Sequence, residues 1–136
     1  MYIMFLTALL LSFSIQAAEL KLEFHGKGIG GQPVLAGIYN SREQFGSKDK
    51  FFKSVIVTAT GDSVTVIIPD VPPGKYAVAA YADSNQNGKQ DKNFLGVPTE
   101  KYGFSNDAHA MFGPPDYSEA LFEVGSGTAT QSIHLR

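Results

Sequence analysis

The segment from Asp83 to Asp91 alternates oxygen-bearing side chains in the order that calcium-binding loops use. Counted from Asp83, the oxygen side chains stand at positions 1, 3, 5 and 9 and glycine at position 6: Asp83, Asn85, Asn87, Asp91 and Gly88. In such a loop alternate side chains converge on the ion, the glycine makes the sharp turn, and the carbonyl at position 7 adds a ligand. The segment therefore predicts a calcium ion bound by Asp83, Asn85, Asn87, the carbonyl of Lys89, and Asp91.

The loop departs from the EF-hand pattern at position 12, where Phe94 stands instead of a bidentate glutamate. A further ligand would have to come from the same region, and Glu100, Asp107 and Asp116 are the candidates. With only two carboxylates in the loop we expect weak binding, with a dissociation constant of roughly 10⁻⁴–10⁻³ M. The alternative is a turn rich in Asn, Asp and Gly that satisfies its own backbone and binds no ion.

Four aromatic residues follow in a region that we expect to be surface loop: Tyr102, Phe104, Phe112 and Tyr117. Exposed Tyr and Phe rings are typical anchors for a ligand or a protein partner, so one hypothesis is a carbohydrate- or peptide-binding surface. The alternative is a long loop that these rings fasten to the domain as a small satellite core.

The three histidines, His25, His109 and His134, are too scattered in the sequence to indicate a metal site. His109 follows Asp107, which could orient it as a base, but no recognised motif places a nucleophile beside it. A hydrolase around His109 and Asp107 is therefore the least favoured hypothesis, and we expect a protein that is not an enzyme.

The whole chain has the composition of one ordinary domain. Its 136 residues are 43% hydrophobic and 18% charged, enough to build a core without disulfides. The net charge is −2 and no Lys/Arg cluster occurs, which argues against a nucleic-acid partner. The absence of cysteine excludes disulfides and thiolate metal sites. We expect a monomer whose partner is an unidentified protein or carbohydrate.

The N-terminus predicts export. The run from Ile3 to Ile15 is apolar but short for a bilayer, and small residues, Ala17 and Ala18, follow it. We interpret residues 1–18 as a signal peptide and residues 19–136 as the mature domain, in the periplasm or outside the cell. Cleavage after Ala17 is equally compatible with the pattern. The alternative is an uncleaved anchor, through which alone the protein would contact the membrane.

The remaining sequence predicts strands. Leu20, Leu22 and Phe24 alternate with polar residues, which is typical of a strand with one wet face. The other expected strands are residues 34–40, 54–60, 63–69, 76–82, 119–124 and 129–135, with a short candidate at 94–97. Residues 54–60 and 63–69, joined by Gly61-Asp62, read as a hairpin, and 76–82 has no wet face and should be central. We therefore predict an all-β, seven-stranded antiparallel β-sandwich.

Several long motifs carry a resemblance to a known family: AGIYNSREQF, VPPGKYAVAAY, D-x-N-x-NG-K-x-D, NFLGVPTEKYGFSN and FGPPDYSEALFEV. With them the chain closely resembles the bacterial secreted proteins of domain-of-unknown-function family 2141, across essentially the whole mature domain. The resemblance implies an exported sandwich of the immunoglobulin or transthyretin type with no established activity. The PPGKY segment is also similar to that of carboxypeptidase regulatory-like and collagen-adhesin B-type modules, which are mostly structural or binding domains.

Overall fold

The computed structural model describes residues 7–9, 18–87 and 100–136. In chain order the elements are β1 (Ala18–His25), β2 (Pro33–Tyr39), β3 (Lys53–Thr58), β4 (Ser63–Val71), β5 (Gly74–Ala82), β6 (Tyr102–Phe104), the 3₁₀ turn η1 (Ser105–Asp107), α1 (Tyr117–Ala120), β7 (Phe122–Val124) and β8 (Thr128–His134). Neither helical turn in the described ranges has the length and apolar character needed to cross a membrane.

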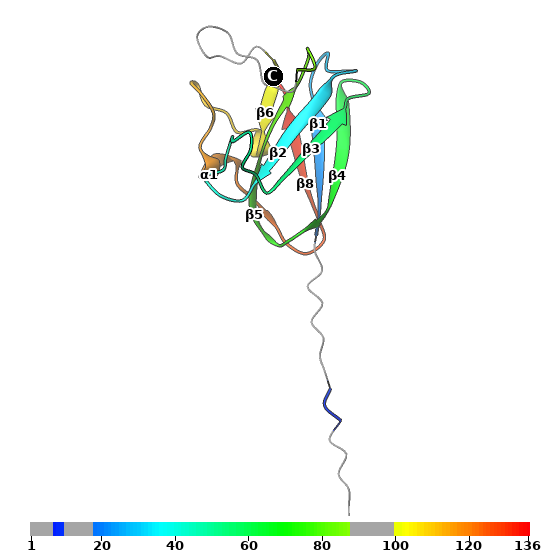
Figure 1. Ribbon diagram of the computed structural model, residues 1–136, viewed down its shortest axis with the longest axis vertical. Helices are drawn as coiled ribbons and strands as arrows, with labels where there is room; N and C mark the ends of the chain where they lie inside the picture. Colours follow the sequence, from blue (N-terminus) through cyan, green and yellow to red (C-terminus); the bar gives the residue numbers. More distant parts are fainter. Residues whose placement is uncertain (1–6, 10–17, 88–99) are drawn as a thin grey trace, which may run out of the picture.

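The described strands form two sheets that pack face to face (Figure 1). One sheet has three strands in the order β4-β1-β8, and the other has five, in the order β3-β2-β5-β6 with β7 also paired to β5. The predicted all-β sandwich is confirmed.

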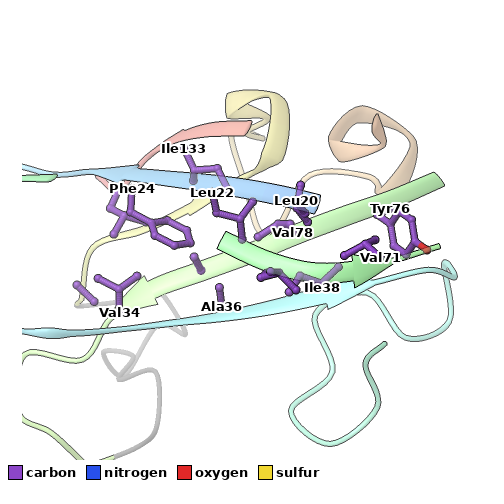
Figure 2. Close-up of a cluster of buried hydrophobic side chains, with 14 of the residues drawn as sticks. Leu20, Leu22, Phe24, Val34, Ala36, Ile38, Val71, Tyr76, Val78 and Ile133 are labelled. Atoms are coloured by element: carbon purple, nitrogen blue, oxygen red, sulfur yellow. The ribbon is translucent and has the colours of Figure 1, made fainter. Parts of the chain in front are cut away.

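The core lies between the sheets and follows the period-2 pattern of the sequence (Figure 2). On β1, Leu20, Leu22 and Phe24 are fully buried, with 0% of their surface exposed. They point toward Val34 on β2 and Val78 on β5, whose exposed fractions are also 0%. A fully buried aliphatic or aromatic side chain stabilises a fold by about 1.5–3 kcal/mol, so this layer holds the two sheets together.

Among the described residues the strand count is one higher than the predicted seven. Residues 102–104 form the short strand β6, and the expected strand at 119–124 is divided into the helical turn α1 and the strand β7. Three residues are too few to show a period in the sequence, and β6 exists because β5 offers its backbone, with Ala80 opposite Gly103. The candidate at 94–97 lies outside the described residues.

One strand pair is parallel, which corrects the expected all-antiparallel arrangement. The strands β1 and β8 run in the same direction, with Leu22 opposite Gln131 and His25 opposite His134. Alternation along a strand shows which side chains face the core, but it carries no information about the direction of the neighbouring strand.

The predicted hairpin of residues 54–60 and 63–69 is also wrong. The strand β3 pairs with β2 and β4 pairs with β1, so residues 59–62 cross from one sheet to the other. Val55 and Val66 therefore reach the same core from opposite sheets. The connection between β1 and β2 runs beside residues 59–62: Gly31 N–H donates to Ala59 O at 2.7 Å, and Gly28 N–H donates to Asp62 Oδ1 at 3.0 Å.

The strand β5 is central, as predicted. It is flanked by β2 on one edge and by β6 and β7 on the other. Tyr76, Val78, Ala80 and Ala82 are buried on the core side, while Tyr81 on the outer side is half-buried. Asp83 directly follows the last residue of β5. The candidate calcium loop is therefore positioned by a strand that is paired on both edges.

Candidate functional site

The predicted calcium loop begins where β5 ends. Asp83 is 2% exposed, and its backbone N–H donates to Pro33 O at 2.8 Å, which fixes it against the start of β2. Asp83 Oδ1 and Asn85 Oδ1 both accept the backbone N–H of Asn87, at 3.2 and 3.3 Å. The side-chain oxygens at loop positions 1 and 3 therefore converge on the backbone N–H of position 5, Asn87. The other predicted ligands, Lys89 and Asp91, lie outside the described residues.

The chain returns to the same place at Glu100. This carboxylate is 6% exposed, and its Oε2 accepts the backbone N–H of Ser84 at 2.6 Å and the hydroxyl of Ser84 at 3.2 Å. Ala82 N–H donates to Lys101 O at 2.9 Å, so the two ends of the segment are joined at its base. Of the three carboxylates considered as an additional ligand, Glu100 is the one that lies beside the loop.

The other two candidates lie elsewhere. Asp107 bonds to His134, as described below, and Asp116 is exposed and precedes α1 without capping it through its side chain. Among the described residues no group of three or more His, Cys, Asp or Glu is arranged to hold a metal. Instead of such a group, the loop would offer a mixture of carboxylate, amide and backbone oxygens. These are the ligands that Ca²⁺ prefers.

Two of the four predicted aromatic anchors, Phe104 and Tyr117, pack against Phe45, a ring that was not singled out from the sequence. The centroid of Phe45 lies 5.9 Å from that of Phe104 and 5.7 Å from those of Tyr117 and Tyr39. Tyr102 continues the chain of rings at 5.9 Å from Phe104. We call these five residues the aromatic cluster.

The cluster fastens two loops to the outer face of the larger sheet. Phe45 comes from the turn after β2, in which Ser41 Oγ accepts the N–H of Gln44 at 3.3 Å. Tyr102, Phe104 and Tyr117 are half-buried. Phe112, the fourth predicted anchor, is 88% exposed and stands beside Met111, which is 89% exposed.

The turn η1 is anchored by two side chains. Ser105, 0% exposed, accepts the backbone N–H of Val78 at 2.9 Å and donates to Ala120 O. The side-chain amide of Asn106 donates to Leu121 O at 2.9 Å, although its backbone is left-handed with φ 60°. These three hydrogen bonds, to β5, to α1 and to the residue after α1, thus fix the position of the next residue, Asp107.

The Asp107 carboxylate binds His134, not His109. Its Oδ1 accepts the backbone N–H of His134 at 2.9 Å, and its Oδ2 lies 2.9 Å from His134 Nδ1. His109 Nδ1 is 3.4 Å from the backbone oxygen of Asp107, so the proposed orientation of His109 by this carboxylate is wrong. His134 in turn stacks on His25, with ring centroids 5.1 Å apart. The histidines that looked scattered in the sequence are partly brought together by the parallel pairing of β1 and β8.

The electrostatics around Asp107 favour its ionised form. Burial alone would raise the pKa of Asp107, but the backbone and side-chain hydrogen bonds from His134 and the charges of His134 and Arg136 outweigh it and lower the pKa. This lowering of the Asp107 pKa requires the folded chain, because His134 and Arg136 are far from Asp107 in the sequence.

A surface hollow of about 310 Å³ opens between β6 and the end of β8. Its walls include Tyr102, Phe104, Asp107, His109, His134 and Arg136. A second, more open hollow lies on the other side of His134 and is lined by His25, Lys27 and Asp62 among others.

Comparison with known families identifies a match over most of the chain. The model of an uncharacterized protein family conserved in bacteria, DUF2141, matches residues 30–132. No curated protein matches the chain. The matched range contains the loop after β5, the aromatic cluster and most of β8.

Proposed function

The chain belongs to this family of uncharacterised bacterial proteins, and we propose from its own residues that it is an exported, monomeric, non-enzymatic binding module whose loop after β5 holds a calcium ion. The observation that carries the calcium proposal is that Glu100 bonds to Ser84, the residue after Asp83, and that both carboxylates are buried at the base of the loop, with 2% of the surface of Asp83 and 6% of that of Glu100 exposed.

Two buried carboxylates at one place favour a cation. Moving an ionised carboxylate out of water is costly, and proteins compensate by pairing it, hydrogen-bonding it or coordinating a metal. Here Asp83 and Asn85 direct side-chain oxygens to the same amide, and Glu100 reaches the intervening Ser84. A Ca²⁺ ion accepts six to eight such oxygens in flexible geometry, so this half of the ligand set suits it.

The calcium site is tested by thermal unfolding of the purified protein with excess Ca²⁺ and with a chelator. A site occupied at a hundred times its dissociation constant adds about 2.7 kcal/mol, a shift of roughly 5–15 °C for a domain of this size. We expect Asp83→Asn and Glu100→Gln to remove most of the shift, since each keeps the shape but loses a negative charge.

Asp116→Asn is the matched control, because it removes the same charge from an exposed position and should leave the calcium shift unchanged. An equal shift in wild type and Asp83→Asn would exclude the loop as the binding site.

Export is proposed from the apolar run that precedes β1. The first strand begins at Ala18, which is 1% exposed and lies opposite Val71. Because Ala18 contributes to the strand, we expect cleavage after Ala17, one of the two positions compatible with the sequence. N-terminal sequencing of the protein from the periplasm or culture medium checks this, and a chain that retains Met1 in the membrane fraction would contradict cleavage and favour the uncleaved anchor.

A second candidate function is a carbohydrate- or peptide-binding module. It is supported by the half-buried rings of Tyr102 and Phe104 at the hollow beside β8. Tyr117 is part of the same cluster, and exposed Phe112 would extend the surface as a separate anchor.

A further inference from the structure

The hollow beside β6 is built on a backbone bridge between two segments distant in the sequence. Tyr102 N–H donates to Arg136 O at 3.1 Å, and Arg136 N–H donates to Tyr102 O at 3.0 Å. This double hydrogen bond places the side chains of both residues around one concave surface of about 310 Å³. A space of that size suits a small molecule of about one sugar ring.

One wall of the hollow is aromatic. Tyr102 and Phe104 both line it, and their rings meet edge to face with centroids 5.9 Å apart. Phe45 packs behind Phe104, so the wall is backed by the aromatic cluster. A ring that is already held by its neighbours loses little conformational freedom when a ligand lies against it.

Other residues that line the hollow offer hydrogen-bond donors. Arg136 is exposed, and within the described ranges no carboxylate forms an ion pair with it at 4.0 Å or less. The nearby carboxylate of Asp107 directs both of its oxygens to His134. The exposed imidazole of His109 also lines the hollow. A planar guanidinium with available N–H groups matches a carboxylate in bidentate geometry.

The backbone beside the hollow is held in an uncommon conformation. Asn106 and Asp107 are consecutive left-handed residues, with φ 60° and 49°. Their geometry is fixed from outside, because Asn106 N–H donates to Gln131 Oε1 at 2.8 Å and Asp107 binds His134. Non-glycine residues held in this region are concentrated at functional sites, where the surrounding structure determines them.

We infer that this hollow binds a monosaccharide-sized ligand that carries a carboxylate, of the uronic acid class. Arg136 binds the carboxylate, and the sugar ring lies against Tyr102 and Phe104. The inference rests on the proposed binding role but not on the calcium site, because neither Glu100 nor any described residue of the loop after β5 lines the hollow.

The test is an NMR titration of the purified protein with glucuronate, glucose and acetate in turn. Glucose supplies the ring without the charge, and acetate supplies the charge without the ring. We expect saturable binding of glucuronate with a dissociation constant of about 1 mM or lower, and at least about tenfold weaker binding of the other two. Arg136→Gln and Tyr102→Ala should each weaken glucuronate binding at least about tenfold.

Lys27→Gln is the matched control, because it removes a positive charge from the neighbouring hollow and should leave the affinity unchanged. Absence of saturation by about 10 mM glucuronate, equal affinity for glucose, or equal loss of affinity in Lys27→Gln would each overturn the inference. A thermal melt with and without Ca²⁺ on the same samples separates the two proposals: a normal calcium shift without glucuronate binding rejects the hollow alone. Retention of the calcium shift in Arg136→Gln shows that the variant is folded.

Discussion

The carboxylate of Asp107 holds His134 at two points, with Oδ1 accepting the backbone N–H at 2.9 Å and Oδ2 lying 2.9 Å from Nδ1. The contact joins the turn η1 to the end of β8. It also orients the ring that stacks on His25, so a single side chain links three segments at this end of the sandwich.

The pH dependence of stability should report this contact. The folded-state pKa of Asp107 is lower than its unfolded value, so its contribution to stability is fully present above about pH 4 and is lost as the pH falls through the lower folded pKa. We expect Asp107→Asn to lower the free energy of unfolding at pH 7 by about 1 kcal/mol and to flatten its decline below about pH 4. Denaturant unfolding measured at intervals between about pH 2 and pH 7 checks this. The same acid profile in Asp107→Asn as in wild type would contradict it.

The buried hydroxyl of Ser105 should contribute strongly to stability. Ser105→Ala leaves Val78 N–H and Ala120 O without this partner inside the protein, and a buried unsatisfied group costs about 1–3 kcal/mol. We expect a loss of that size in chemical unfolding. Ser118→Ala makes the same change at an exposed position of α1 and should stay within about 0.5 kcal/mol of wild type. Equal effects of the two substitutions would show that the Ser105 hydrogen bonds do not stabilise the fold.

The aromatic cluster should depend on Phe45 and not on Phe112. Phe45→Ala removes ring contacts to Tyr39, Phe104 and Tyr117, and we expect a loss of about 2–3 kcal/mol. Phe112→Ala changes a ring that is 88% exposed and should alter stability by less than about 0.5 kcal/mol.

Limited proteolysis gives a second measure of the same cluster. Because Phe45 holds Tyr117, its loss should speed cleavage in the segment between η1 and α1, whereas Phe112→Ala should not. If the rate of cleavage in Phe45→Ala equals that in wild type, the segment between η1 and α1 is held by Ser105 and Asn106 alone.

Local pattern was enough to predict much of the sandwich. The alternation of Leu20, Leu22 and Phe24 indicated which face of β1 is buried, and all three are fully buried. The unbroken apolar run after Tyr76 indicated a central strand, and β5 is paired on both edges. These inferences hold because the burial of a strand face depends on residues two apart.

The start of the candidate calcium loop was equally visible in the sequence. Asp83, Asn85 and Asn87 occupy alternate positions within five residues, and the hydrogen bonds between them need only local geometry. Glu100 was one of three carboxylates considered, and the choice among them required the fold, because sequence distance does not show which one returns to Ser84.

By itself, then, the sequence determined the fold class, the buried faces and the first half of the candidate calcium site. Tertiary structure decided which strands pair, that β1 and β8 run parallel, that residues 59–62 cross between sheets, and that Asp107 faces His134. The physical reason is the range of the interactions: side-chain alternation is set by neighbours along the chain. Strand partners and side-chain pairs such as Asp107–His134, by contrast, form only when the whole chain closes around one core.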